Sequence, residues 1–154
     1  MKTKAHAHSG CASNPTPLPE LAARLRRQSH KVTGPRQAIL DTLRRQHGPV
    51  TIREIFEELG SGDCDLATVY RSMHLLETMR MVKRFDFGDG AARFELLAEG
   101  DDGHHHHLVC TRCTNVVEIE DCFPEELQSG IARRNGFKSV THRLEFFGVC
   151  PSCQ

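Results

Sequence analysis

Two Cys-x-x-Cys motifs constrain this chain more than any other feature of its sequence. The first comprises Cys110 and Cys113, and the second comprises Cys150 and Cys153 near the C-terminal end of the 154 residues. Four thiolates in two such pairs form the ligand set of a closed, tetrahedral structural zinc site. A redox motif needs only one pair, and cysteines that merely fill a core need no regular spacing. The sequence therefore predicts a structural Zn²⁺ that joins two distant segments.

The distribution of charge indicates two modules with different partners. The net charge is zero, but residues 1–88 carry 14 Lys and Arg against 9 Asp and Glu, whereas residues 89–154 carry 6 against 11. There is no run of eighteen apolar residues and no apolar N-terminal segment of the signal-peptide type. We therefore expect a cytoplasmic protein, in which seven cysteines are used for metal binding more often than for disulfides.

The first module is predicted to be helical after a flexible N-terminal arm over residues 1–17. The arm is polar and contains His6, His8 and Cys11, which we interpret as side chains of a solvated tail. Helical periodicity then begins at Leu18 and recurs in "VTGPRQAILDTLRRQHG", in the segment after a Thr51–Glu54 capping box, and after Asp65 as an N-cap. The fourth helix is expected to bury Leu66, Val69, Met73 and Leu76.

The outer face of this fourth helix suits DNA. It carries Thr68 and Arg71, with Tyr70 on its flank, although a solvated surface helix explains these residues alone slightly better. The segments "MVKRFDF" and "AARFELL" around "GDG" predict a hairpin, and three helices followed by a hairpin describe a winged helix. That context favours the DNA interpretation. Phosphate contacts are then expected from Lys31, Arg36, Lys83 and Arg84.

The second module is small. Strands are predicted in "HHHHLVC", "NVVEIE" and "SVTHRLEFFG", and a helix in "CFPEELQSGIARRNG" has an apolar stripe of Phe123, Leu127 and Ile131. The fold class is therefore α+β, with a winged helix-turn-helix domain including its hinge over residues 18–97 and a small α/β dimerisation domain over residues 98–154. Its few strands leave apolar edges that a second copy covers in a homodimer.

Four consecutive histidines precede the first cysteine pair. If they lie in a strand, His105 and His107 point to one face and His104 and His106 to the other. Each pair then needs further ligands, for which the candidates are Glu95, Glu118, Glu125 and His142. For His142 a core role is as good an interpretation as a ligand role. Imidazole with carboxylate suits zinc, iron(II), manganese or cobalt, so ligand chemistry does not select the metal.

Several segments together resemble one family. The motifs "KVTGPRQAIL", "LATVYRSMHLLE", "RFELL", "HHHHLVCTRC", "VVEIED" and "THRLEFFGVCPSC" are similar to the ferric uptake regulator family of bacterial metal-dependent repressors, over about residues 18–154. The resemblance implies a winged-helix domain, a hinge and a dimerisation domain with a four-cysteine zinc site. It implies a regulatory metal site at Glu95, His105, His107 and Glu118, and a second site at His104, His106, Glu125 and His142. It also implies DNA contacts from Lys31, Tyr70 and Arg71.

One position departs from the family pattern. Many members carry a histidine directly before the third helix, where it completes the regulatory site, but this chain has Pro49 there and His47 two residues earlier. His47 is therefore a candidate replacement ligand. Asp101 and Asp102, in the acidic segment before the histidines, are further candidates, although solvated loop charges explain them better. Glutamate at positions 95 and 118 favours an iron sensor over zinc-sensing or peroxide-sensing members.

The resemblance thus implies a repressor that binds double-stranded DNA at an A/T-rich palindrome and controls iron uptake genes. Fe²⁺ is the expected regulatory ion, with Mn²⁺ or Zn²⁺ as alternatives, and the sequence leaves open whether dimers pair into tetramers. The competing classes are a metalloenzyme and a metal-storage protein. An enzyme needs an open coordination position, yet there is no H-E-x-x-H motif, and storage leaves the winged helix without a role.

Overall fold

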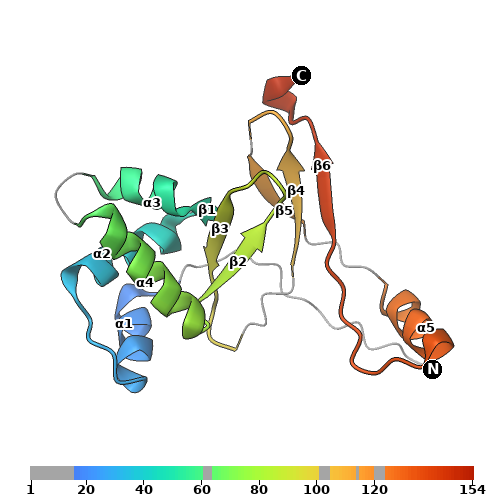
Figure 1. The fold of residues 1–154 in the computed structure, drawn as a ribbon, viewed down its shortest axis with the longest axis horizontal. Coiled ribbons are helices and arrows are strands. Elements are labelled where there is room, and N and C mark those ends of the chain that lie inside the picture. Colours follow the sequence, from blue (N-terminus) through green and yellow to red (C-terminus); the bar gives the residue numbers. More distant parts are fainter. Residues whose placement is uncertain (1–15, 61–63, 101–104, 114, 120–123) are drawn as a thin grey trace.

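The computed structural model describes residues 16–60, 64–100, 105–113, 115–119 and 124–154. The helices are α1 (Leu18–Arg27), α2 (Gly34–Arg45), α3 (Ile52–Leu59), α4 (Leu66–Thr78) and α5 (Glu125–Asn135). Several residues singled out from the sequence lie outside the described ranges, namely His6, His8, Cys11, Asp101, Asp102, His104 and Phe123. In Figure 1, α1–α4 lie on one side of a small sheet and a second sheet lies on its other side.

The predicted helix starts at Thr51 and Asp65 are confirmed by their hydrogen bonds. The backbone N–H of Glu54 donates to Thr51 Oγ1 at 3.1 Å, and the Thr51 N–H donates to Glu54 Oε2 at 2.7 Å. The backbone N–H of Thr68 donates to Asp65 Oδ1 at 2.6 Å. Each cap satisfies backbone donors that the first turn of a helix leaves without partners.

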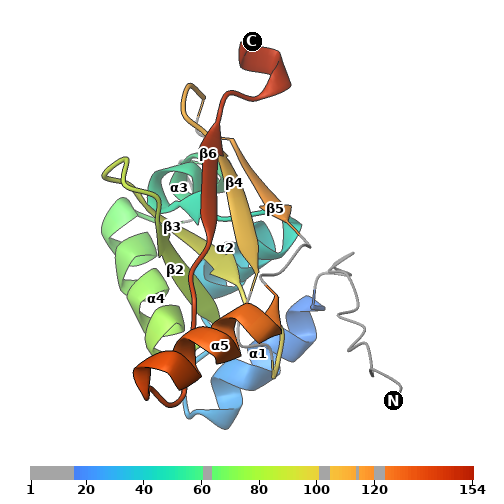
Figure 2. The ribbon, with the colours of Figure 1, turned by 90° about the vertical axis from the view of Figure 1, so that its right-hand side faces the viewer.

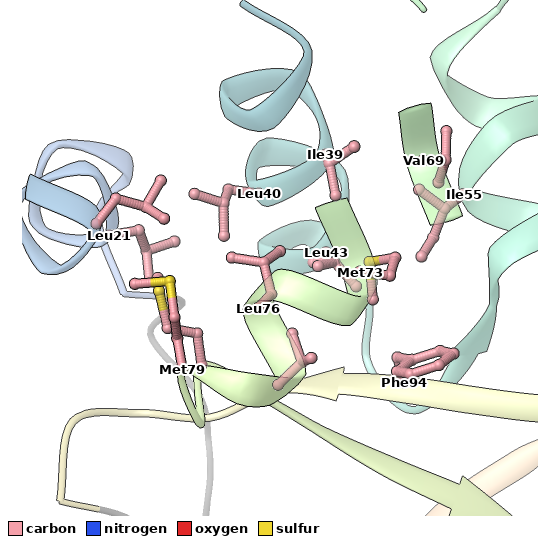
Figure 3. Packing of buried hydrophobic residues seen from close by; sticks show 13 residues of the cluster. Leu21, Ile39, Leu40, Leu43, Ile55, Val69, Met73, Leu76, Met79 and Phe94 are labelled. Atoms are coloured by element: carbon pink, nitrogen blue, oxygen red, sulfur yellow. The ribbon is translucent and has the colours of Figure 1, made fainter. Parts of the chain in front are cut away.

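The main hydrophobic core lies between α1–α4 and the first sheet (Figure 3). Val69, Met73 and Leu76 of α4 are fully buried there, as predicted. Leu66 was expected to be buried with them, but it is 41% exposed. Ser72, which was not expected in the core, is buried. The buried stripe centres between Val69 and Leu76, about 70° around the helix from Leu66, so this first helical residue lies at its margin.

The first sheet confirms the predicted hairpin and adds one strand. Strands β2 (Val82–Asp86) and β3 (Ala92–Leu96) pair antiparallel, with Val82 opposite Leu96. The connecting turn contains Gly88 and Gly90, both at φ +80°, a conformation that favours glycine. Strand β1 (Val50–Thr51) pairs with the other edge of β3 and was not expected, since two residues carry no periodicity. We call β2, β3 and their turn the wing.

The second sheet has the strand order β5-β4-β6. Strand β4 (His106–Cys110) pairs antiparallel with β5 (Val116–Ile119) and parallel with β6 (Glu145–Gly148), and Figure 2 shows β4 between its two neighbours. A strand was expected over residues 139–148, but it begins only at Glu145. The backbone before it is engaged differently, because the carbonyl of Val140 accepts a hydrogen bond from Gln128 of α5.

Helix α5 lies apart from α1–α4 in Figure 1, and Gln128 connects it to the segment before β6. It ends as predicted at Gly136, which adopts the left-handed conformation at φ 69°. None of its residues is buried, and Leu127 and Ile131 of the expected apolar stripe are 42% and 41% exposed. Within the described ranges, no helix has the length and apolar character that a membrane span requires.

Candidate metal centres

The four cysteines of the two motifs come together at the end of the second sheet. Cys110 ends β4, Cys113 lies in the following turn, and Cys150 and Cys153 flank and close the 3₁₀ helix Pro151–Cys153. Their Sγ atoms all lie within 4.8 Å of one another, and those of Cys113 and Cys150 are 3.6 Å apart. A tetrahedral zinc–thiolate site with bonds of about 2.3 Å has Sγ–Sγ distances of about 3.8 Å. The cluster therefore has the dimensions of such a site.

The charge state of this cluster also suits a divalent cation. The pKa of the Cys110 thiol is lowered to about 6 by backbone N–H groups of Cys113, Cys150 and Arg112. Those of Cys150 and Arg112 approach the Cys110 Sγ at 3.3 and 3.4 Å. The pKa of Cys153 is raised to about 12 by the neighbouring thiols of Cys150 and Cys113. A bound cation reverses this second effect, because a coordinated thiol loses its proton.

A second cluster joins the two sheets. Glu95 lies in β3 of the wing, whereas His105 directly precedes β4 and His107 lies within it. The His105 Nε2 is 2.8 Å from Glu95 Oε2, and the His107 Nε2 is 3.6 Å from the same oxygen. Donor atoms of the three residues all lie within 4.8 Å of one another. The arrangement offers two imidazoles and one carboxylate from two different sheets.

The buried environment of His107 suits a metal ligand. Its side chain is 1% exposed, and its ring packs edge-on against Phe85 and Phe87 of the wing, with centroids 4.6 and 5.4 Å apart. Its Nε2 is buried without a hydrogen-bond partner among the described residues. A buried polar atom without a hydrogen bond destabilises the fold, and metal coordination is one of the few explanations for it. The donor set therefore fits a divalent metal.

Without a metal, the electrostatics of this cluster favour an ionised Glu95 and a protonated His105, and a bound cation takes the place of the His105 proton. Burial by itself raises the pKa of the Glu95 carboxyl, but the imidazoles of His105 and His107 more than offset it and lower this pKa to about 2. Burial likewise tends to lower the pKa of His105, but its hydrogen bond and charge interaction with Glu95, aided by Glu118, raise it. Glu95 is therefore ionised at neutral pH, as a metal ligand must be.

Three other candidate residues, His47, Lys83 and Glu118, are not part of this cluster. Glu118 lies opposite His107 in the β4–β5 register but is not among the three residues whose donor atoms converge. His47 is exposed and is likewise not part of that group. Lys83, expected to face phosphate, has its Nζ 5.2 Å from the Phe85 ring centroid and lies opposite Glu95 in the wing. It therefore lies on the face of the wing that carries Phe85.

The other face of β4 carries His106, which is 2% exposed. Its Nε2 lies 3.3 Å from the Nε2 of His142, and the Nδ1 of His142 lies 2.5 Å from Gln128 Oε1. Glu125, the expected carboxylate here, is an exposed residue at the start of α5. Sequence reasoning missed Gln128, although its position one helical turn after Glu125 was an available signal.

The candidate DNA contacts lie on exposed parts of the helical region. Tyr70 is 56% exposed on α4, and the exposed Arg71 donates to Thr68 Oγ1 at 2.8 Å. Arg36 donates to the backbone carbonyl of the exposed Lys31 at 2.7 Å, which fixes the loop before α2. These side chains occupy two neighbouring segments, the outer face of α4 and the approach to α2.

Comparisons with known proteins agree with this architecture. The Ferric uptake regulation protein of Bacillus subtilis (strain 168) is 35% identical over 144 residues, which cover 88% of this chain and 93% of that protein. The crystal structure of the Vibrio cholerae ferric uptake regulator is 32% identical, with a TM-score of 0.70, and the match covers 84% of this chain and 99% of that one.

A zinc-bound manganese uptake regulator is also 32% identical with a TM-score of 0.70, covering 86% of this chain and 98% of that one. The model of the family described as "Ferric uptake regulator family" matches residues 27–147. This match spans both sheets, the cluster of Glu95, His105 and His107, and the first cysteine pair. The chain therefore belongs to the ferric uptake regulator family.

Proposed function

We propose that this member of the family is a metal-dependent transcriptional repressor that responds to Fe²⁺ and binds an A/T-rich palindromic operator as a homodimer. The observation that supports it most is the convergence of Glu95 with His105 and His107. Glu95 belongs to the wing and the histidines to the second sheet. An ion held by all three ties the DNA-binding domain, residues 18–97, to the dimerisation domain, residues 98–154.

The mechanism follows from what these residues do. Glu95 supplies negative charge from the wing, and His105 and His107 supply neutral nitrogens from β4. Glu95, His105 and His107 would hold the cation, which would supply a positive charge beside the Glu95 carboxylate and an interaction for the buried His107 Nε2. The angle between the domains is thereby restricted, so that the two α4 helices of a dimer reach adjacent half-sites in the major groove. A metal that prefers the DNA-competent form a hundredfold contributes about 2.7 kcal/mol of coupling.

Two aspects of the chain support DNA as the partner. Helix α4 presents Tyr70 and Arg71 on its outer face, and Asp65 caps the N-terminal end from which that face begins. The surplus of positive charge lies in residues 1–88. Basic residues around α2, including Lys31 and Arg36, are suited to phosphate contacts, which would make binding strongly dependent on salt.

The choice of ion rests on the family and the donor set. Relatives are named for ferric uptake regulation, which supports iron, and two imidazoles with carboxylate suit Fe²⁺. A similar solved structure is a zinc-bound manganese uptake regulator, so Mn²⁺ and Zn²⁺ remain alternative occupants. Glu118 and His47 are the nearest candidates for additional ligands after domain movement. Because the family consists of regulators, a metalloenzyme or storage role has less support.

The remaining sites have separate roles in this proposal. Cys110, Cys113, Cys150 and Cys153 hold a structural Zn²⁺ that stabilises the second sheet. His106 and His142, with His104 and Glu125, form the second metal site of the dimerisation domain. The exposed apolar residues of α5 and of the second sheet, including Leu127, Ile131, Phe146 and Phe147, face the second copy in the dimer.

The test is operator binding as a function of metal. DNA selected from a randomised pool by the wild-type protein with Mn²⁺ is used in gel shifts across Fe²⁺, Mn²⁺ and Zn²⁺. Replacing His105 and His107 together by alanine is expected to abolish metal-dependent binding while zinc content and circular dichroism stay unchanged. Retained metal-dependent binding by this double variant would refute the assignment. A response to Zn²⁺ alone would make the protein a zinc sensor.

A further inference from the structure

A buried arginine in α1 connects two segments that the proposed function requires to move together. The side chain of Arg24 is in the core region, and the residue is 9% exposed. Its guanidinium donates to the carbonyl of Leu97 at 2.8 Å and to the carbonyl of Arg80 at 3.3 Å. Both acceptors are backbone atoms far away in the chain. A buried cation is costly, so this arrangement depends on the geometry of these two carbonyls.

One acceptor, Arg80, lies directly after the C-cap of α4, the helix proposed to bind DNA. The N–H of Met81 donates to Leu76 and that of Arg80 to Glu77, which together form a Schellman motif at the end of α4. Position 80 is left-handed, at φ 52°, although it carries a side chain rather than glycine. The contact from Arg24 therefore supports a strained peptide that fixes the direction of the chain as it leaves α4.

The second acceptor, Leu97, begins the segment that leads from the wing to the second sheet. Leu97 is buried and directly follows β3. Its N–H donates to the carbonyl of Met81 at 2.9 Å, while its own carbonyl accepts from Arg24. The N–H of Leu97 is thus bound to the segment just after α4, and its carbonyl is bound to α1. The linker cannot change direction at this point without breaking hydrogen bonds to α4 or α1.

A neighbouring contact provides a comparison on the same helix. Arg27, one turn after Arg24, binds both carboxylate oxygens of Glu99 at 2.8 Å. The side chains of this pair are 54% and 55% exposed, and the pair does not reach the end of α4. Exposed ion pairs contribute little. Arg27 therefore touches the same linker without the burial and without the connection to Arg80.

We infer that Arg24 is a positioning residue for DNA recognition, which holds the C-terminal end of α4 and the first linker residue in one fixed relation. This inference rests on the proposed function, in which metal sets the angle between the domains and α4 meets DNA. Because one planar guanidinium binds both the segment after α4 and the first linker residue, a change in the angle between the domains also moves the C-terminal end of α4. Arg24 touches neither metal nor DNA in this role.

The test compares three full-length variants: Arg24→Met, Arg24→Lys and Arg27→Gln. The probe is duplex DNA selected from a randomised pool by the wild-type protein in Mn²⁺. Affinity for this DNA at saturating Mn²⁺ and affinity for Mn²⁺ without DNA are measured at a temperature where circular dichroism shows each variant folded. Hydrogen exchange of the peptides covering residues 77–81 and 97–100 is measured in parallel.

We expect Arg24→Met to weaken DNA binding about tenfold, within the range for residues that couple two sites, with little change in Mn²⁺ affinity. Exchange should accelerate in both peptides. Arg24→Lys should recover part of the affinity, because an ammonium donates to one carbonyl at a time, and Arg27→Gln should bind like wild type. If Arg24→Met does not fold, the test is whether Arg24→Lys binds DNA more weakly than both the wild type and Arg27→Gln.

Two results would overturn the inference while leaving the proposed function intact. One is wild-type DNA affinity per folded molecule in Arg24→Met with only a lower melting temperature, which marks a purely structural role. The other is an equal loss of affinity in Arg27→Gln. If the wild-type protein itself selects no DNA in Mn²⁺, the proposed function fails first and this inference falls with it.

Discussion

At the level of single residues, His107 is well packed but its Nε2 is poorly hydrogen-bonded. Its imidazole is buried between Phe85 and Phe87, yet its Nε2 has no hydrogen-bond partner among the described residues. A leucine of similar volume would satisfy the packing and remove the orphaned nitrogen. The Glu95 carboxylate, 3.6 Å away, is charged but too distant for a hydrogen bond, and a bound ion would give this Nε2 a direct partner.

The two neighbouring histidines should differ in their effect on stability. With the regulatory metal removed and zinc retained, His107→Leu should change the free energy of unfolding by less than about 1 kcal/mol, because removing a buried unsatisfied nitrogen offsets the loss of its interaction with Glu95. His105→Leu should destabilise it by about 1–3 kcal/mol, because the Glu95 carboxylate loses its partner at 2.8 Å. Both should lose the stabilisation that added Mn²⁺ gives. Urea unfolding measures this, and equal effects of the two substitutions would contradict it.

Tyr70 gives a prediction for α4, the helix proposed to bind DNA. Its side chain is 56% exposed, so Tyr70→Ala should change the free energy of unfolding by less than about 0.5 kcal/mol. If it meets a base in the major groove, the same substitution should cost about 1–3 kcal/mol of operator binding. Fluorescence anisotropy with selected DNA measures the loss. Thr78→Ala at the other end of α4 is the control, and equal affinities for both variants would exclude Tyr70 from the interface.

At the scale of elements, the wing depends on an ion pair at its turn. Arg93 is 4% exposed and donates to both carboxylate oxygens of Asp89, at 2.9 and 2.7 Å. The Arg93 guanidinium and nearby backbone N–H groups lower the pKa of Asp89 to about 2. The Arg93 guanidinium also lies over the Phe87 ring, 5.6 Å from the ring centroid. The turn therefore supports the aromatic side of the wing, against which His107 packs.

This pair predicts a pH dependence with a defined sign. The folded pKa of Asp89, about 2, lies below its ordinary value of 3.8, so ionised Asp89 stabilises the fold above about pH 4. The stabilisation is lost as the pH falls from about 4 towards 2. Melting temperatures of wild type and Asp89→Asn should therefore differ most near pH 6 and converge towards pH 3. A constant difference across that range would contradict the assignment.

Elements with strong local signals were predictable from the sequence, and those that depend on distant contacts were not. The caps at Thr51 and Asp65 fixed two helix starts, and strand alternation correctly put His106 on the face opposite His107. The late start of the strand at Glu145 was missed, because Gln128 of another element engages Val140. Strand alternation also puts Lys83 and Phe85 on one face of β2, whereas the approach of the Lys83 Nζ to the Phe85 ring depends on side-chain conformation.

At the scale of the whole molecule, the second module has little core of its own. The buried apolar residues of its described part are Val109 and Cys110, and Val109 packs against Phe85 and Phe87 of the wing. The four-cysteine cluster joins the end of β4 to the C-terminal segment. We therefore expect much of the stability of this module to come from zinc and from the second copy of the chain.

Zinc removal tests that expectation. Cys110→Ser should reduce bound zinc from about one ion per chain to none, because a structural site needs all four ligands. The second module should then unfold and the dimer dissociate, as measured by circular dichroism and sedimentation. Cys64→Ser, outside the cluster and packed against the helical core, should keep its zinc. A folded dimer without zinc would show that the metal is dispensable.

If metal binding between the sheets and DNA binding by α4 are coupled, thermodynamic linkage requires the coupling to act in both directions. Metal that strengthens operator binding by a given factor must itself bind more tightly, by the same factor, when the operator is present. Calorimetric Mn²⁺ titration of the protein with and without saturating selected DNA measures this factor. We predict tighter Mn²⁺ binding with DNA by about a hundredfold, and loss of the effect in His105→Ala. Equal Mn²⁺ affinity in both titrations would mean that metal binding and DNA binding are not coupled.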